Sequence, residues 1–321
     1  MAANIPTSFS FSTFIRVLLP GFIFSLLCTY FVFPIIPASF ASFLIIDKIL
    51  MLSLLDKILF WAITGLFFGM LISSFDYYIY RFFTGSGILP QFLWDGLYRS
   101  IIFEYNKLIT DYDTKLGRYS SSEDPEEHRK LYRDLVDMSN KLRKFPFDID
   151  ELCTRPISPT RLGNIINEYE SYPKVQYGMN FNVFWSRLWQ IISKDSRDDL
   201  DFRAAKADFL IYILTIWILF SPVITYRVST NFGIPAIFII ILCFLIALIL
   251  YDIAVLAHEN YGDYVKATFD LYRIDLAKKL GIPISLCPRR DEMAIWEKYN
   301  EFLHHCDVPE SVSQLNNIIE R

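Results

Sequence analysis

The chain has 321 residues, of which 53% are hydrophobic, 17% aromatic and 21% charged. Its net charge of −4 gives no global attraction to nucleic acid or to anionic lipid, so duplex DNA is not expected as a partner. Its five cysteines include no Cys-x-x-Cys pair, which argues against a disulfide framework and against a zinc module.

Four windows without a charged side chain divide the chain, and they are 17–46, 58–75, 209–226 and 228–251. At about 1.5 Å per residue, a helix over each window crosses a hydrocarbon core of roughly 30 Å, or nearly so. Most charges lie instead in 86–207 and 263–321. The pattern predicts an all-α, polytopic membrane protein with four transmembrane helices in a lipid bilayer and a helical cytoplasmic domain.

The first window is longer than one crossing needs, and Pro34 and Pro37 would break a helix within it. The first span is therefore predicted from about Thr13 to Phe33. The following stretch, 38–55, is apolar apart from Asp47 and Lys48 and reads as an interfacial or re-entrant segment on the outer side. It is either a lid on the span ends or a segment that lines a pore.

The second span is predicted from Ile58 to about Tyr80. It contains Gly65 and Gly69, whose spacing of four residues lets helix backbones approach closely. This pair is expected to pack against a neighbouring helix, either of the same chain or of a second copy.

Between the second and third spans the sequence predicts several helices. Apolar residues recur with a helical period over 91–116, and a second helix begins after Asp124, with Pro125 at its first position. These two helices should form an antiparallel pair. A short helix is expected near 161–170, and Asn180 can cap another over 181–192.

The third and fourth spans extend beyond the membrane as helices. From about Arg197 a polar helical pattern enters the third span without a breaker, and the fourth continues to Leu280. A continuous helix over 235–280 would be roughly 69 Å long, about twice a bilayer core, and would act as a lever between membrane and cytoplasm. One or two short helices are expected over 290–306 and 310–319, and no strand pattern occurs.

The flanking charges predict the topology. Four spans place both termini and residues 85–207 on one side, and basic residues near span ends favour the cytoplasm for that side: Arg81, Arg99, Lys194, Arg197, Arg203, Lys206, Lys266 and Arg273, against Lys48, Lys57 and Arg227. The predicted division is 1–84 for the first two transmembrane helices with the outer segment, 85–207 for a helical cytoplasmic domain, 208–256 for the third and fourth transmembrane helices, and 257–321 for a cytoplasmic helical extension and tail.

Five ionisable residues lie at the predicted inner ends of the spans. They are Arg16, Asp76, Asp252, His258 and Glu259. Their heads can reach water by snorkelling, which is the simpler interpretation. Alternatively they form a polar ring, in which Asp76 and Asp252 either pair with Arg16 or line a cytoplasmic vestibule that favours cations.

A mixture of basic and aromatic residues marks the middle segment as a candidate ligand site. Such side chains can stack on and neutralise a nucleotide or an oligonucleotide, although aromatic packing between helices explains the same pattern. The candidates are Arg155, Arg161, Lys174, Arg187, Tyr177, Trp185 and Trp189.

No phosphate loop, nucleophile elbow, dinucleotide fingerprint or metal-protease helix occurs, so neither catalysis nor a cofactor is expected. His304, His305 and Cys306 are the only close cluster of metal-capable side chains. Adjacent histidines on a helix point in different directions, and no metal is predicted there.

Two stretches carry a resemblance to known proteins. The first comprises Pro159-Thr160-Arg161-Leu162-Gly163-Asn164-Ile165 with Tyr177-Gly178 and Phe184-Trp185-Ser186-Arg187-Leu188-Trp189, and the second comprises Tyr261-Gly262 with Phe269-Asp270-Leu271-Tyr272-Arg273. Together they resemble a widespread group of uncharacterised bacterial inner-membrane proteins. In plan, though not in motif, the chain is also similar to membrane effectors of antiphage defence systems such as Hailong. That likeness implies an oligomeric channel under nucleotide control, with the ligand near Arg161 to Trp189.

The leading hypothesis is therefore a homo-oligomeric channel or pore-like effector of the bacterial inner membrane, plausibly a tetramer. Its cytoplasmic helices would sense a ligand or partner, and its role would lie in antiphage defence. The main alternative is a membrane-anchored scaffold that docks a cytoplasmic partner protein. A transporter and an enzyme with an unrecognised site are the remaining readings.

Overall fold

The computed structural model describes residues 11–35, 53–85, 91–146, 157–282, 284 and 289–305. Within these ranges every regular element is a helix and no strand occurs. The chain divides into two compact units. The first unit is Met1–Phe82 with Asp201–His258, and the second unit is Phe83–Leu200 with Glu259–Arg321.

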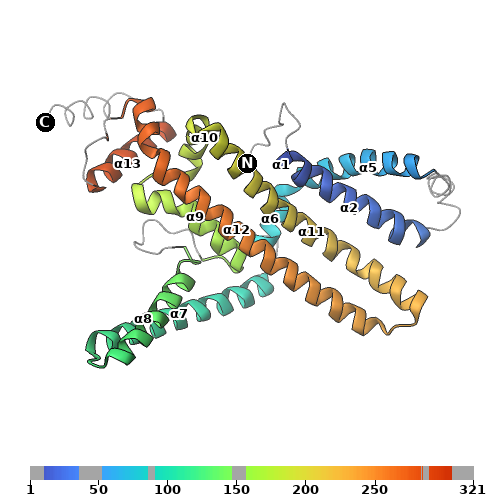
Figure 1. The fold of residues 1–321 in the computed structure, drawn as a ribbon, viewed down its shortest axis with the longest axis horizontal. Coiled ribbons are helices and arrows are strands. Elements are labelled where there is room, and N and C mark those ends of the chain that lie inside the picture. The colour runs from blue at the N-terminus through green and yellow to red at the C-terminus, as the bar shows by residue number, and fades with distance from the viewer. Residues whose placement is uncertain are drawn as a thin grey trace. The chain divides into compact units, whose positions relative to one another are not determined.

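Four helical stretches are long and apolar enough to cross a membrane. They are Phe11–Ile35, Leu54–Ser74, Lys194–Phe232 and Ala236–Leu280, and the mean hydropathy of their most apolar windows is 2.0, 1.7, 2.0 and 3.0, respectively. The last two are the long helices α11 (Lys194–Phe232) and α12 (Ala236–Leu280) in Figure 1. The prediction of an all-helical chain with four membrane-spanning helices is confirmed for the described residues.

The first span is a helix of mixed hydrogen-bond register. It passes from α1 (Phe11–Thr13) through the π-helix η1 (Phe14–Leu18), α2 (Leu19–Leu27) and the π-helix η2 (Cys28–Val32) into the short 3₁₀ helix η3 (Phe33–Ile35). Each π segment ends two residues before a proline, Pro20 or Pro34. Proline cannot donate to the carbonyl four residues earlier, and its ring crowds that carbonyl. The neighbouring amides bond one residue further back instead, as Leu19 does to the Phe14 carbonyl.

The second span is shorter than predicted. Helix α5 (Leu54–Ser74) begins after Ser53, whose hydroxyl accepts from the Asp56 amide, and it ends where Phe75 leaves helical geometry. A separate helix, α6 (Asp76–Thr84), follows. The expectation of one helix to Tyr80 is therefore wrong at its end. Most of the predicted outer segment, residues 38–52, lies outside the described part of the chain.

Helices α2 and α5 pack through three glycines. A methyl group at Gly21 would overlap backbone atoms of Gly65 and Gly69, and one at Gly69 would overlap the Val17 carbonyl. At Gly65 it would lie 3.0 Å from the Phe22 Cα. The predicted small-residue contact of Gly65 and Gly69 is thus made within the chain, against a third glycine.

Polar side chains add hydrogen bonds between the apolar helices of the first unit. Ser25 and Thr64 join α2 to α5 at 2.6 Å. The indole N–H of Trp217 on α11 donates to the Cys243 carbonyl on α12 at 2.9 Å. Such bonds satisfy groups that lipid cannot solvate.

The second unit contains a helical pair, α7 (Gln91–Ser121) and α8 (Pro125–Leu142), which lie side by side in Figure 1. Asp124 caps α8 as predicted, because its carboxylate accepts from the Glu126 amide. Leu131 and Leu135 are buried, and Lys115 pairs with Asp134 at 2.6 Å. The short connection makes the two helices antiparallel.

Three further helices pack with the later part of α12 to form the core of the second unit. They are α9 (Arg161–Tyr177), α10 (Phe181–Ile191) and α13 (Arg289–His305). Phe184 and Trp296 are fully buried, with ring centroids 5.0 Å apart. Asn180 caps α10 as predicted.

Helix α9 is longer than its predicted range of 161–170. It continues through Pro173 and ends at Gly178, which has a left-handed φ of 75°. There the Gly178 amide donates to the Lys174 carbonyl, as in the αL capping motif, and the Met179 amide donates to the Pro173 carbonyl. The glycine, and not the proline, therefore sets the end of the helix.

Candidate functional site

The first unit holds a network of charged and hydroxyl side chains around Arg16, which lies in η1. Its Nε atom is 2.7 Å from Asp208 Oδ2, and an Nη atom is 3.7 Å from Asp201 Oδ1. Ser12 donates to Asp201, and the Tyr80 hydroxyl donates to Asp208 at 2.5 Å. The first span, α6 and α11 thus meet through charges.

The network extends to two more pairs. His258 on α12 is buried, and its Nε2 atom is 3.2 Å from the Tyr80 oxygen. The Tyr212 hydroxyl on α11 donates to Asp76 at 2.9 Å. Below, the "Arg16 network" means these eight residues: Ser12, Arg16, Asp76, Tyr80, Asp201, Asp208, Tyr212 and His258.

Carboxylates outnumber cations in the Arg16 network. One guanidinium stands against Asp76, Asp201 and Asp208, so full ionisation leaves an excess of two negative charges. Charges among apolar helices are costly unless they are paired, and an uncompensated carboxylate attracts a positive ion. The fully ionised network would therefore attract cations and repel anions.

The structure brings three members of the predicted polar ring together, namely Arg16, Asp76 and His258. The predicted partners of Arg16, however, were Asp76 and Asp252, and its ion pairs are formed with Asp201 and Asp208 on α11. Asp252 precedes His258 by six residues on α12, which turns it about 240° around the helix. Glu259 belongs to the second unit, where it pairs with Lys144 at 2.9 Å.

Asp201 and Asp208 were missed from the sequence, although a signal for Asp208 existed. It directly precedes the charge-free window that begins at Phe209. A carboxylate at the edge of a span requires a partner. Sequence alone did not indicate that the partner would be Arg16, far away along the chain.

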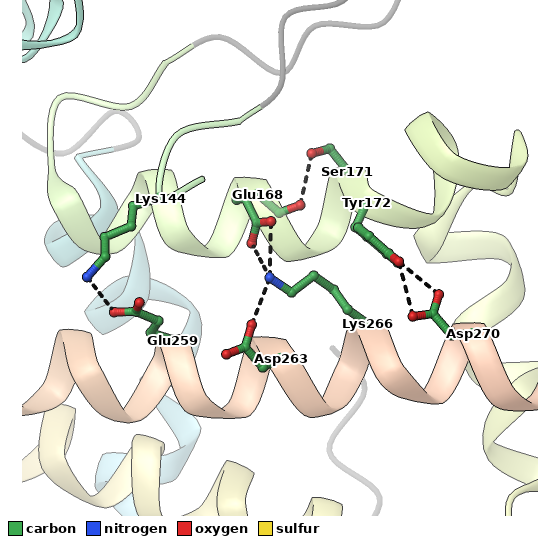
Figure 2. Close-up of polar contacts among 8 residues, drawn as sticks. All are labelled: Lys144, Glu168, Ser171, Tyr172, Glu259, Asp263, Lys266 and Asp270. Atoms are coloured by element: carbon green, nitrogen blue, oxygen red, sulfur yellow. Dashed lines mark hydrogen bonds and ion pairs between the residues drawn. The ribbon is translucent and has the colours of Figure 1, made fainter. Parts of the chain in front are cut away.

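In the second unit, α9 and α12 are joined by ion pairs (Figure 2). The Lys266 Nζ atom lies 3.1 Å from both carboxylate oxygens of Glu168 and 2.9 Å from Asp263. Burial raises the pKa of the Glu168 carboxyl, although the Lys266 ammonium acts in the opposite direction. Tyr169 packs on Gly262 beside this pair, where a Cβ atom would overlap the tyrosine ring.

Asp270 on α12 accepts hydrogen bonds from two tyrosines. The Tyr172 hydroxyl, drawn in Figure 2, is 2.9 Å from Oδ1, and the Tyr177 hydroxyl is 2.6 Å from the same atom. The Arg273 guanidinium lies 4.2 Å from the centre of the Tyr177 ring and pairs with Glu292 at 2.9 Å. Burial and the nearby Asp270 carboxylate raise the pKa of both tyrosine hydroxyls.

Replacing Asp270 with alanine is expected to lower the free energy of unfolding of the second unit by about 2 kcal/mol, because two half-buried hydroxyls lose their acceptor. Asp275→Ala is the matched control, since Asp275 forms an exposed ion pair with Lys278 and should change stability by less than about 0.5 kcal/mol. Denaturant unfolding followed by circular dichroism measures both. Equal losses in the two variants would show that the tyrosine contacts are not stabilising.

Two of the predicted aromatic ligand residues, Trp185 and Trp189, are in contact with each other and with the core. Trp185 stacks on Phe181 and Phe269, with centroids 5.4 and 5.9 Å away, and Trp189 lies under the Arg197 guanidinium. Tyr177 is engaged by Asp270, as described above. The indole rings therefore have a packing role, and a ligand role for them stays a prediction.

The basic ligand candidates are distributed over two helices. Arg161 and Lys174 lie at the two ends of α9, while Arg187 on α10 donates to the Val183 carbonyl one turn earlier. Arg155 lies outside the described residues. The described basic residues therefore do not converge on one helix end.

Among the described residues, no group of three or more histidine, cysteine or acidic side chains is placed to hold a metal ion. The side chains of His304 and His305, and all of Cys306, lie outside the described part. No protein-family model matches the chain, and no match was found among curated proteins or solved structures.

Proposed function

We propose that this chain assembles with copies of itself into a cation-conducting channel in the inner membrane of a bacterium, gated through its second unit. The observation that best supports this proposal is the Arg16 network, in which carboxylates exceed cations among helices apolar enough to span a bilayer. Carboxylates along an ion path favour cations over anions. The network lies where the predicted spans meet the cytoplasm.

The proposed orientation places both termini and the second unit in the cytoplasm. It follows from the basic residues near the span ends, which are more numerous on that side of the predicted spans. The proposal that the membrane is a bacterial inner membrane rests on the resemblance carried by 159–189 and 261–276.

Gating would act through α12. This helix contributes His258 to the Arg16 network, and its next turns carry the residues that contact α9, including Lys266 and Asp270. A nucleotide or a partner protein that shifts α9 would change these contacts and bias α12 toward one position. Conduction would then be controlled by a ligand or partner that binds one position of α12 more tightly than the other. Antiphage defence is the proposed biological setting.

Assembly from identical subunits is supported by the apolar surface of α12. Large side chains on several faces of its first turns are exposed within one chain, among them Ile237, Phe238, Ile241, Leu242 and Phe244. In a membrane such a surface contacts lipid or another subunit. A tetramer is our working stoichiometry, because few spans per chain require several chains around a path.

The test is conductance of the purified protein in planar bilayers. Replacing Asp252 with asparagine is expected to reduce the preference for potassium over chloride several-fold, because it removes a charge from the proposed vestibule. Asp111→Asn on α7 makes the same change in the second unit and should leave selectivity unaltered. Membranes that stay silent with nucleotides and at both voltage signs would contradict the channel. Unchanged selectivity in Asp252→Asn would remove this residue from the path.

A scaffold is the second candidate, and one surface favours it. An open groove runs between α7 and α8, and it is lined by Tyr112, Leu116, Tyr119, Tyr132, Leu135, Val136, Ser139, Asn140 and Arg143. Apolar and aromatic grooves between helices are suited to bind a partner helix. Monomeric protein in mild detergent, with a soluble protein bound at this groove, would favour the scaffold over the channel.

A further inference from the structure

His258 occupies an unusual position in the first unit. Its side chain is on α12, only 3% of the residue is exposed, and its ring stands edge-on to Tyr80, with centroids 5.6 Å apart. Histidine is the side chain whose ordinary titration falls nearest to neutral pH. A buried histidine in a charged network is thus a candidate for binding a proton.

The hydrogen bonds determine the tautomer of His258. An ionised carboxylate only accepts hydrogen bonds, so the single proton of the Tyr80 hydroxyl is donated to Asp208, 2.5 Å away. The contact of 3.2 Å between Tyr80 and His258 must then be donated by the imidazole Nε2–H. Neutral His258 therefore carries its proton on Nε2 and a lone pair on Nδ1.

None of the described residues donates to that lone pair. The Nδ1 atom is buried and has no hydrogen-bond partner among the described residues. A buried polar atom without a partner costs free energy, and it is a place where a structure can accept a ligand. The smallest ligand that an imidazole lone pair can accept is a proton, which needs no cavity.

The charges that face His258 favour a positive ring. Tyr80 on α6 connects it directly to Asp208 on α11, and Asp76 and Asp201 belong to the same network. Arg16 compensates one of these three carboxylates, while Glu259, next to His258 on α12, is paired with Lys144. A proton on His258 would reduce the excess negative charge of the network from two to one.

We propose that His258 is a proton-binding site of the first unit. A proton from water adds to the Nδ1 lone pair, the Nε2–H bond to Tyr80 is kept, and no covalent bond breaks. The imidazolium is held by the Tyr80–Asp208 pair. In the channel proposed above, this proton regulates conduction from the cytoplasmic side. This regulatory role rests on the proposed function.

The direct test is nitrogen NMR of the full chain in nanodiscs, with labelled histidine. The protein has four histidines. A His128→Gln, His304→Gln, His305→Gln variant leaves His258 as the only signal, and the wild-type chain labelled in the same way controls for altered folding. At about pH 8 we expect the Nε2–H tautomer, and on acidification to about pH 4 one transition to imidazolium.

Tyr80→Phe removes the link to Asp208 and should lower the proton affinity of His258 about tenfold, a shift of roughly one pH unit. Tyr132→Phe on α8 is the control and should cause no shift. An Nδ1–H tautomer at high pH would overturn the proposal. So would a ring that stays neutral until circular dichroism shows unfolding, or a midpoint that Tyr80→Phe does not move.

Bilayer recordings separate the proton site from the channel. If the channel proposal holds, conductance should change at least about threefold on acidification from pH 7.5 to about pH 4, and His258→Gln should abolish the change, since a glutamine amide does not titrate. Bilayers that are silent at every pH would refute the channel and leave the NMR result to decide the proton site. A pH response that His258→Gln retains would overturn regulation by this proton.

Discussion

The Arg16→Met variant is expected to be about 3 kcal/mol less stable than the wild-type chain, because loss of the guanidinium leaves the Asp208 carboxylate without its cation. The two side chains form the closest ion pair of the Arg16 network, at 2.7 Å, and both are largely shielded from water. Methionine is long and apolar, so it fills the same space without carrying charge. The loss therefore reports on the uncompensated carboxylate and not on a cavity.

A double-mutant cycle isolates that effect. Asp208→Asn removes the carboxylate charge, and the double variant Arg16→Met, Asp208→Asn should recover at least half of the stability lost by Arg16→Met alone. Lys141→Met is the control, since Lys141 forms an exposed ion pair with Asp137 one turn away and should contribute less than about 1 kcal/mol. Thermal unfolding in detergent, followed by tryptophan fluorescence, measures all four proteins. Simple additivity of the two single changes would contradict a functional ion pair.

The second large effect is expected at Gly21, where alanine should destabilise the first unit by at least about 2 kcal/mol. Its methyl group would overlap backbone atoms of Gly65 and Gly69, which cannot move aside without separating α2 from α5. Separation removes van der Waals contacts along both helices, and these contacts are the main attraction between helices in lipid. No rotamer change can relieve the overlap, since alanine has no rotamers.

The same substitution should have the opposite sign at Gly117. This residue lies within α7, and nothing lies within 4 Å of the position that a Cβ atom would occupy. Alanine is favoured over glycine within a helix by about 1 kcal/mol, so Gly117→Ala should raise the stability of the second unit. Unfolding of each variant is again followed in detergent. A stable Gly21→Ala protein with unchanged unfolding would show that α2 and α5 do not make this close contact.

The helices that could be predicted are those specified by local chemistry. Four spans follow from four windows without charge, because a lipid core excludes charge along a whole segment. The starts of α8 and α10 follow from Asp124 and Asn180, whose side chains bond to amides two residues later. In each case the residues that decide the outcome are neighbours in sequence.

The features that sequence reasoning missed depend on distant partners. The helix expected near 161–170 was predicted too short, because the packing of α9 on α12 carries it on to Gly178. Gly21 and Ser25 have the same small-residue spacing as Gly65 and Gly69, but this signal was overlooked, and only the contact with α5 reveals the role of Gly21. Several acidic residues at span ends could pair with Arg16, and only the folded structure shows that Asp201 and Asp208 do so.

Pro20 affects the direction in which the Arg16 side chain points. A π turn holds one residue more than an α-helical turn, and each residue of an α-helix corresponds to about 100° of rotation. If η1 were to tighten into an ordinary α-helix, its residues would rotate by up to about that angle relative to α2, and the Arg16 guanidinium would turn away from its partners on α11. Pro20, which has neither a charge nor an amide hydrogen, thereby sets the direction in which the only cation of the Arg16 network points.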